Sequence, residues 1–244
     1  MIECPDLFKL DGRYVLLYNP QRRDNEKDTD ISSFSAVRFI GFNEQDGTFD
    51  DEDLDSRFSK TDYGFDFYAP QTFEDKKGRR ILYAWMSRMD SKQEAVFSAG
   101  EPRIHCLTLP RELKVRDGQL IQTPVRELEQ LKGSEVPVTY DGKFAARLHP
   151  SDRTYCLRST IPAPGSKVSI TFHGGEASLT WMPERQNIRF TRKNWVTGQE
   201  EYRDCPAEIL SEIEIWSDRS SMEIFINGGE AVMSSRIFPE SSIY

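Results

Sequence analysis

The sequence predicts an all-β protein, and two observations support this prediction. Apolar residues recur at every second position in short runs, which is the period of a strand with one buried face. Each run is closed by Gly, Asn or Asp, residues that tolerate the positive φ of tight turns. Helical periodicity is nearly absent from the 244 residues. We therefore expect antiparallel sheets built from hairpins.

The individual strands and turns follow from these runs. The clearest predicted strands are residues 14–18, 35–42, 80–86, 168–172, 177–181, 209–217 and 222–226. The predicted turns are Asp11-Gly12, Asp46-Gly47, Lys77-Gly78, Asp117-Gly118, Asp141-Gly142 and Asn227-Gly228.

The chain is expected to form two units, with the boundary near residue 133. Residues 127–131 read as a short helical or irregular connector, and beyond it the Asp-rich loops of the first half give way to plain hairpins. In the second unit, residues 212–229 form two alternating strands joined by a polar turn. One face of these strands is apolar and the other charged, as expected of a sheet that a partner sheet covers on one side.

Charge and hydropathy exclude several classes of partner. Forty acidic residues against 32 basic ones give a net charge of −8, and no basic block is long enough for a nucleic-acid site. No stretch approaches the roughly 20 apolar residues of a membrane span. The first residues are too acidic and too short for a secretory signal, and any such signal would lie upstream. We therefore expect neither nucleic acid nor membrane as a partner, and the sequence makes no prediction of oligomeric state.

The cysteines predict neither a zinc site nor a disulfide framework. Cys4, Cys106, Cys156 and Cys205 are scattered without CxxC or Cys/His ligand spacing. We expect buried free thiols in a reducing compartment, which favours a cytoplasmic location, and we expect no metal or other cofactor. The three histidines, at 105, 149 and 173, lie far apart and are expected to be structural or at the surface.

Two motifs combine carboxylates with features that suit a binding site. Near the start, Glu3 and Asp6 lie three residues apart in front of a predicted strand, where Pro5 interrupts regular backbone pairing. In residues 61–73, aspartates alternate with aromatic residues around Gly64. Sugars stack their C–H faces on aromatic rings and offer hydroxyls to carboxylates, so this segment suits a sugar site. An Asp-rich loop that caps a turn explains it equally well.

Two further positions each leave two interpretations open. Trp85, at the end of the strand at 80–86, is by default a core residue, and alternatively a platform for a sugar ring. Arg111, next to Glu112 in a Leu-Pro-Arg-Glu-Leu run, either braces a neighbouring acid through a charge-assisted hydrogen bond or forms an ordinary ion pair.

Taken in order, these motifs resemble glycoside hydrolase family 32, the invertases, sucrose-6-phosphate hydrolases and fructanases. The resemblance covers most of the first half, and the second half is similar to the family's C-terminal domain. The segments that carry it are Glu-Cys-Pro-Asp at 3–6, Asp-Tyr-Gly at 62–64, Asp-Phe-Tyr-Ala-Pro-Gln at 66–71, Gly-Arg-Arg-Ile at 78–81, Trp-Met at 85–86, Leu-Pro-Arg-Glu-Leu at 109–113, residues 220–227 and Ser-Arg-Ile-Phe-Pro at 235–239.

The resemblance implies a fold, an activity and roles for four residues. It implies a five-bladed β-propeller followed by a β-sandwich, here residues 1–133 and 134–244, with no cofactor. The implied activity is hydrolysis of terminal β-D-fructofuranosides, with retention of configuration through a fructosyl-aspartate intermediate. Glu3 then corresponds to the general acid/base, which requires a carboxyl group that stays protonated near neutral pH. Asp62 corresponds to a substrate-binding carboxylate, with Asp66 and Tyr68 as further candidates in the pocket.

The sequence also departs from the family pattern. The family's nucleophile lies in an Asn-Asp-Pro segment and a second aspartate in an Arg-Asp-Pro segment, and neither tripeptide occurs here. We therefore expect a partial sequence that holds about the last three blades and a sandwich lacking its last strand, inactive on its own. The alternative is a non-catalytic fructoside-binding module or a partner-completed remnant. Within the charged stretch at 21–30, Arg22, Arg23 and Lys27 either bind a 6-phosphate or are simply solvated.

Overall fold

The computed structural model describes residues 2–20, 35–49, 58–87, 91–98, 105–135, 154–161 and 165–239. Over these ranges the chain is all-β, as predicted, and its strands form four larger antiparallel sheets of the size of propeller blades. The one α-helix in this part of the chain is α1 (Ser91–Ser98). None of its helices is long and apolar enough to cross a membrane.

The first half of the chain forms two of the larger sheets. One has the order β1-β2-β3-β6, and between β3 and β6 in sequence the strands β4 and β5 form a separate two-stranded ladder. Their bounds are β1 (Ile2–Leu10), β2 (Arg13–Pro20), β3 (Ala36–Ile40), β4 (Phe42–Asn43), β5 (Thr48–Phe49) and β6 (Ser59–Lys60). The second sheet has the order β11-β10-β8-β7, with β9 paired to β8. It consists of β7 (Tyr68–Glu74), β8 (Arg80–Met86), β9 (Cys106–Leu107), β10 (Arg111–Arg116) and β11 (Gln119–Pro124).

An apolar core joins these two sheets. Phe8, Val15 and Leu17 of the first sheet form one cluster with Leu82 and Leu113 of the second. The alternation of the strands explains this, because every second side chain of β2 and β8 points to the same face. The 3₁₀ helix η2 (Arg126–Leu131) follows β11, in the place predicted for a connector.

The second half forms the other two larger sheets, of four strands each. The orders are β12-β17-β18-β19 and β13-β14-β15-β16. The strands are β12 (Tyr155–Thr160), β13 (Val168–Phe172), β14 (Ala177–Met182), β15 (Asn187–Lys193), β16 (Glu200–Pro206), β17 (Glu212–Asp218), β18 (Ser221–Ile226) and β19 (Ala231–Arg236). Short 3₁₀ turns, η3 (His173–Gly175) and η4 (Pro183–Arg185), connect β13 to β14 and β14 to β15. Both sheets contribute to one core, with Trp181 and Phe190 from one and Ile215 and Ile224 from the other.

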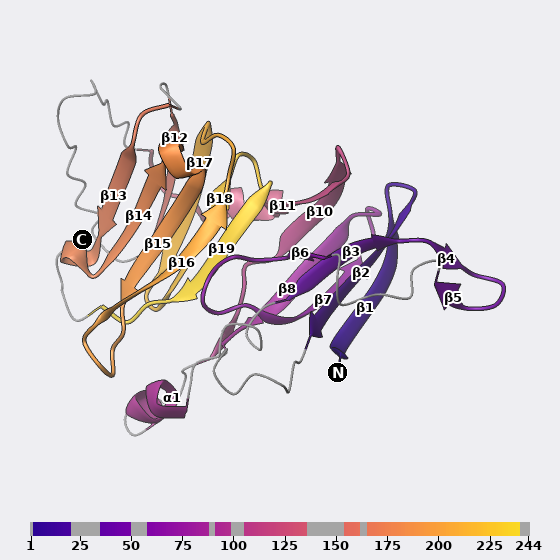
Figure 1. Ribbon diagram of the computed structural model, residues 1–244, viewed down its shortest axis with the longest axis horizontal. Coiled ribbons are helices and arrows are strands. Elements are labelled where there is room, and N and C mark those ends of the chain that lie inside the picture. Colours follow the sequence, from indigo (N-terminus) through magenta and orange to yellow (C-terminus); the bar gives the residue numbers. More distant parts are fainter. Residues whose placement is uncertain are drawn as a thin grey trace.

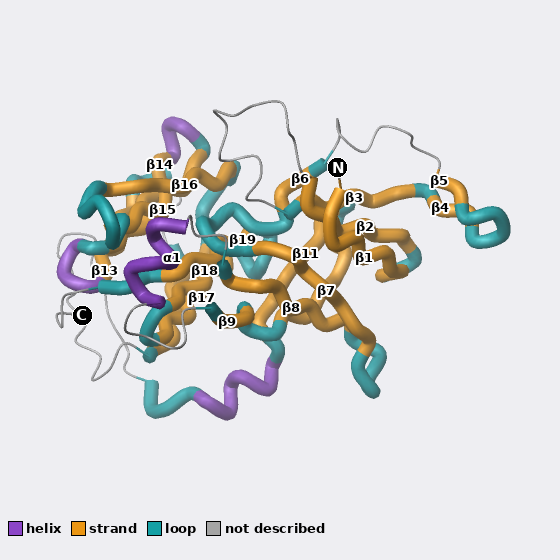
Figure 2. The backbone as a smooth tube through the Cα atoms, turned by 90° about the horizontal axis from the view of Figure 1, so that it is seen from below, coloured by secondary structure: helices purple, strands orange, loops and turns teal. Residues whose placement is uncertain are grey.

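The two halves meet along β19, which lies next to the first half in both overall views (Figures 1 and 2). The backbones approach so closely that a Cβ on Gly64 would lie 2.0 Å from the carbonyl oxygen of Ser234. A Cβ on Gly229 would lie 2.0 Å from the carbonyl oxygen of Gln122. No other residue type fits such a contact without a shift of the backbone.

Most predicted strands are confirmed, and β8 and β13 match their predicted bounds. The expectation for 209–217 is wrong at its start, because β17 begins at Glu212. The side-chain N–H of Asn227 donates to the carbonyl of Ile209, and the side-chain oxygen of Asn227 accepts from the backbone N–H of Ser211. These backbone groups of Ile209 and Ser211 therefore bond to a side chain and not to a neighbouring strand.

Four further expectations are corrected. Glu3 and Asp6 lie within β1 rather than in front of a strand. The described part of the first half holds two larger sheets rather than about three blades. Strand β18 is buried on both faces, not on one, because the first half covers the face that carries Glu223. All four cysteines are free, but only Cys205 is buried and Cys4 is exposed.

Candidate functional site

Two β-bulges lie side by side at the candidate site. The pairing of β1 with β2 shifts between Glu3 and Asp6, and the pairing of β7 with β8 shifts between Tyr68 and Gln71. Each bulge holds a residue in the left-handed region, with φ of 49° at both Cys4 and Ala69. Bulges of this kind bend a strand and redirect its side chains, and they are frequent next to active sites. Pro5 and Pro70, each following a left-handed residue, cannot donate to the ladder, which explains why the pairing breaks there.

The two bulges bring together two of the residues predicted from the sequence. The hydroxyl of Tyr68 donates a hydrogen bond to Oε2 of Glu3, across 65 residues of sequence. Glu3 is partly exposed, whereas only 6% of Tyr68 is exposed. A carboxyl group that is held by a buried donor and open to solvent on another side can exchange a proton with a bound molecule.

Further contacts fix the two strands against each other. The backbone N–H of Thr72 donates to Oδ2 of Asp6 at 2.7 Å. The side-chain amide of Gln71 donates to the carbonyls of Pro70 at 2.9 Å and Cys4 at 3.4 Å. Asp6 therefore joins the two sheets of the first half beside Glu3. Sequence reasoning noted this carboxylate but gave it no role.

Trp85 lies beside Tyr68, because the two residues are cross-strand partners in β7 and β8. The default expectation of a core tryptophan is wrong, since 38% of Trp85 is exposed. Its ring packs edge-on against the ring of His105, with 5.1 Å between the ring centres. Nε2 of His105 lies 2.8 Å from Oε1 of Glu94 in α1. Trp85 is therefore partly open to solvent beside Tyr68, and its use as a sugar platform stays a prediction.

The structure places Asp62 away from Glu3, at the junction of the two halves. Its side chain is 0% exposed. Oδ1 accepts from the backbone N–H groups of Gly64 and Ser234, both at 2.8 Å. Oδ2 accepts from the hydroxyl of Ser234 at 2.7 Å and from Nη1 of Arg111 at 3.2 Å. Four donors from the protein thus surround this carboxylate.

Asp66 occupies a matching position four residues further on. Its Oδ2 accepts from Nη1 of Arg192 at 2.5 Å and from the backbone N–H of Arg236 at 2.8 Å. Asp66 is 1% exposed. The structure therefore brings Glu3 and Tyr68 together and places Asp62 and Asp66 on the second half, and substrate binding by these two aspartates stays a prediction.

Between these aspartates, an irregular stretch of chain runs along the outer edge of β19. The backbone N–H of Tyr63 donates to the carbonyl of Val232 at 2.8 Å, and that of Asp66 donates to the carbonyl of Ser234 at 3.0 Å. The outward N–H groups of Ser234 and Arg236 bind the carboxylates of Asp62 and Asp66 instead of backbone carbonyls. Every edge group from the carbonyl of Val232 to the N–H of Arg236 is thereby satisfied, which an uncovered edge strand is not.

Arg111 is the centre of the buried charge cluster at this junction. Its side chain is 0% exposed and all five of its N–H donors are used. The acceptors are Oδ2 of Asp62, Oε1 of Gln122, the hydroxyl of Ser234 and Oε2 of Glu223, which accepts from both Nε and Nη2. Arg111 thus pairs with Asp62 and Glu223 and not with the adjacent Glu112, and these contacts fit both interpretations, a brace for a neighbouring acid and a structural ion pair.

Sequence reasoning gave no role to Glu223 of this cluster or to Arg192, which binds Asp66. Glu223 interrupts the apolar run of β18, and this lone charge was the one available signal. Its burial raises the pKa of its carboxyl group, against the opposing effect of Arg111. Arg192 lies in an alternating strand, where its position predicts only that it faces inward.

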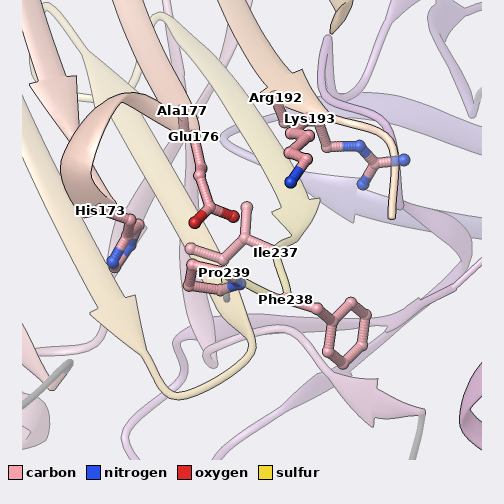
Figure 3. Close-up of a pocket in the computed structure, with 8 residues that line it drawn as sticks. All are labelled: His173, Glu176, Ala177, Arg192, Lys193, Ile237, Phe238 and Pro239. Carbon is pink, nitrogen blue, oxygen red and sulfur yellow. The ribbon is translucent and has the colours of Figure 1, made fainter. Parts of the chain in front are cut away.

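Two hollows among the described residues lie away from Glu3 and Tyr68. One, between η3 and the segment after β19, holds about 10 Å³ and is lined by His173, Glu176, Arg192 and Ile237 among others (Figure 3). That is roughly the space of one water molecule, which is too small for a sugar ring. A second hollow, of about 340 Å³, lies at Gly12 and Arg13, at the opposite end of β1 from Glu3. Among the described residues no three His, Cys, Asp or Glu side chains are grouped for a metal ion.

Comparison with known proteins agrees with the two halves. The family model "Glycosyl hydrolases family 32 N-terminal domain" matches residues 1–124, and "Glycosyl hydrolases family 32 C terminal" matches residues 129–244. A sucrose-6-phosphate hydrolase of Bacillus subtilis is 35% identical over 98% of this chain and 50% of its own length. A raffinose invertase of Escherichia coli is 34% identical over 99% of this chain and 50% of its own length.

The fold is found in a solved structure as well. A variant of the Bombyx mori β-fructofuranosidase, determined in complex with sucrose, superimposes with a TM-score of 0.72 at 23% identity, over 99% of this chain and 50% of that one. The chain thus spans about half the length of the relatives it matches. Since the two family models together cover almost all of its residues, the chain belongs to glycosyl hydrolase family 32.

Proposed function

We propose that this chain supplies the acid/base part of an enzyme that hydrolyses terminal β-D-fructofuranosides with retention of configuration. The observation that carries the proposal is the contact of Glu3 with Tyr68 at two facing bulges, in a chain of this family. Glu3 protonates the glycosidic oxygen as the leaving group departs and then takes a proton from the attacking water. Tyr68, as a buried donor to Oε2, orients the carboxyl group for both steps.

A retaining mechanism needs a second carboxylate, about 5 to 5.5 Å from the first. The sequence contains no Asn-Asp-Pro and no Arg-Asp-Pro segment. We therefore assign the nucleophile to a segment outside these 244 residues and expect this chain by itself not to turn over a fructoside. The missing segment also favours a second candidate function, a module that binds fructosides without cleaving them.

The substrate class is proposed from the names of the relatives, which include sucrose-6-phosphate hydrolases and a raffinose invertase. Sucrose, sucrose 6-phosphate and fructans all present a terminal fructosyl group, so each fits the proposed chemistry. Arg22, Arg23 and Lys27, the candidates for a 6-phosphate, lie outside the described residues. Tyr68 and the partly exposed Trp85 are proposed to border the fructosyl group, with Asp62 and Asp66 holding the segment that carries Tyr68.

The architecture is proposed in more detail as well. The sheets β1-β2-β3-β6 and β11-β10-β8-β7 are proposed to be blades of a five-bladed propeller, and the two sheets of the second half to be a β-sandwich. Two observations support this: the blade-sized sheets pack through one apolar core, and the sheets of the second half share another.

A chimera tests the enzymatic proposal. The part of the Bacillus subtilis relative that this chain does not match is joined in front of this chain, and release of fructose from sucrose and sucrose 6-phosphate is measured. We expect hydrolysis by the chimera and a loss of about 10²- to 10⁴-fold in kcat with Glu3→Gln, the usual contribution of general acid–base catalysis. The loss is expected to be smaller for a fructoside whose leaving group needs no protonation.

The controls separate the two candidate functions. Glu74→Gln changes an exposed carboxylate on β7 and should leave kcat unchanged. A folded chimera in which Glu3→Gln has no effect on kcat contradicts the assignment of Glu3. A folded chimera that binds fructosides but releases no fructose favours the binding module.

A further inference from the structure

The segment that carries Tyr68 is built more into the second half of the molecule than into the first. Phe65 belongs to the apolar core of the second half. Its ring packs edge-on against the ring of Phe190, with 6.2 Å between the ring centres. Tyr63 packs against the same core. Together with the hydrogen bonds to β19, this attaches the irregular segment 63–66 to the edge of the second half, although it precedes that half by about 90 residues in sequence.

Arg192 fixes this segment at the end nearest to Tyr68. Only 4% of Arg192 is exposed, and its guanidinium lies 3.9 Å from the centre of the Phe65 ring and 4.9 Å from that of Trp195. Besides Asp66, it binds Oε1 of Glu201 through Nε at 2.7 Å and the carbonyl of Arg236 through Nη1 at 2.7 Å. A planar guanidinium held by two rings and three acceptors has one available geometry.

Three consecutive side chains are then anchored in three different places. Asp66 binds Arg192 in the second half, Phe67 lies in the core of the first half, and Tyr68 binds Glu3. Two residues span at most about 7 Å, so a shift of Asp66 must be passed on to Tyr68. The bulge at Ala69 follows at once, and its left-handed backbone is retained only where its neighbours hold it in place.

We propose that the second half positions the candidate acid/base, with Arg192 as the positioning residue that acts through Asp66 and Tyr68 on Glu3. Arg192 is buried and acts through its bond to Asp66. Its removal is therefore expected to loosen the bond between Tyr68 and Glu3 while the rest of the second half stays folded. The inference rests on the proposed function only in the role given to Glu3, because the geometry itself concerns two side chains of this chain.

The test measures the coupling of Tyr68 to Glu3 in this chain without any substrate. With ¹³C-labelled tyrosine and glutamate, the ring carbon that bears the Tyr68 hydroxyl should change its resonance as the carboxyl of Glu3 titrates; Glu3→Gln and Tyr68→Phe assign the two signals. In Arg192→Gln we expect this response of Tyr68 to be lost. Arg192→Lys, which keeps the charge but not the planar fork, should restore it only in part.

Arg189→Gln is the matched control, because Arg189 lies on the same strand and pairs with Asp204 at 2.7 Å near the surface. It should leave the Tyr68 response intact. A folded Arg192→Gln chain that keeps the full response overturns the proposal. If Arg192→Gln does not fold, Asp66→Asn, which keeps the shape of the side chain, decides in the same way.

The outcome is independent of the proposed function. Loss of the coupling in Arg192→Gln supports the inference even where the chimera releases no fructose. If the chimera releases fructose and depends on Glu3, but its pH profile and kcat are the same with Arg192→Gln, the proposed function stands and the positioning role is overturned.

Discussion

At the scale of single residues, burial determines how much each ion pair contributes to the stability of the folded protein. Arg111 is a cation without solvent contact between two carboxylates, Asp62 and Glu223, whose side chains are 0% and 5% exposed. Removing the cation leaves both carboxylates in the interior without a charged partner, which is the costly way to break a buried pair. At the surface, Arg189 binds both oxygens of Asp204, and this pair keeps its access to water.

We expect Arg111→Met to lower the free energy of unfolding by about 3–5 kcal/mol, because methionine fills the space and satisfies neither carboxylate. The measurement is urea unfolding followed by far-UV circular dichroism. Arg189→Met, the surface control, should cost less than about 1 kcal/mol. Equal losses of unfolding free energy in the two variants would contradict the view that burial sets the contribution of Arg111 to stability.

Gly64 offers a second test of the same junction. A Cβ at this position meets the backbone of Ser234, which no rotamer change can move. We expect Gly64→Ala to destabilise the protein by about 1–3 kcal/mol, the usual range for overpacking a close contact. Gly133→Ala is the control, since a Cβ there has nothing within 4 Å. Thermal unfolding of both variants gives the comparison, and no difference between them would contradict the close approach.

At the scale of elements, η2 is joined to the β7–β8 hairpin by ion pairs. Nη1 and Nη2 of Arg79 bind both oxygens of Glu127, at 3.0 and 2.9 Å, and Lys77 adds a third bond at 3.0 Å. These hydrogen bonds, that of Arg79 foremost, lower the pKa of Glu127 from its usual 4.5 to about 2. Glu127 is exposed to water, so the contribution of its pairing is modest and depends on salt.

The sign of the pH dependence follows from this lowered pKa. The stabilisation by Glu127 is complete above pH 4.5, its value in the unfolded chain, and is lost as the pH falls towards 2. We expect Arg79→Gln to raise the midpoint of the Glu127 carboxyl resonance in an NMR titration towards 4.5. Arg126→Gln, at a neighbouring arginine 3.8 Å from the same carboxylate, should shift the midpoint far less. An unchanged midpoint in Arg79→Gln would contradict the role of this bidentate pair.

The elements themselves were predictable in part from the sequence. A period of two fixes which residues face inward, as in β14, which was predicted, and β15 follows the same alternation although it was not among the predicted strands. The bulge at Cys4 was also predictable, since Pro5 has no backbone N–H to donate to a strand ladder. The failure at Ile209 has a local cause: its backbone pairs with the side chain of Asn227, and periodicity carries no sign of such a bond.

The site was predictable in part for a different reason. Glu3 and Tyr68 were found through motifs, yet Asp62 in the same motifs was compatible with a turn cap or a sugar ligand. Its contacts with the second half carried no sequence signal, because Asp62 and Ser234 are 172 residues apart and meet in the folded protein alone. For the same reason Arg192 carried no signal, since its alternating strand looks like any other.

At the scale of the whole molecule, the two halves are expected to unfold together. The junction combines backbone hydrogen bonds, two buried arginines and Phe65, which crosses into the core of the second half. We expect peptides from β1–β11 and from β12–β19 to lose hydrogen-exchange protection at the same urea concentration, as in a two-state transition. Gly64→Ala should shift both midpoints by the same amount. Two separate midpoints in the unaltered chain would contradict this cooperativity.

The covered edge of β19 has a consequence for the order in which the molecule assembles. Residues 62–66 leave the ribosome long before Val232 and Ser234, so during synthesis they have no edge to join. Until then Asp62 and Asp66 lack the backbone N–H groups of Ser234 and Arg236 that bind their carboxylates. The contacts that complete the bulge at Tyr68 are thus among the most distant in sequence and are expected to form last. On a ribosome that stalls before β19, we therefore expect the two sheets of the first half to have formed, but not yet the hydrogen bond between Tyr68 and Glu3.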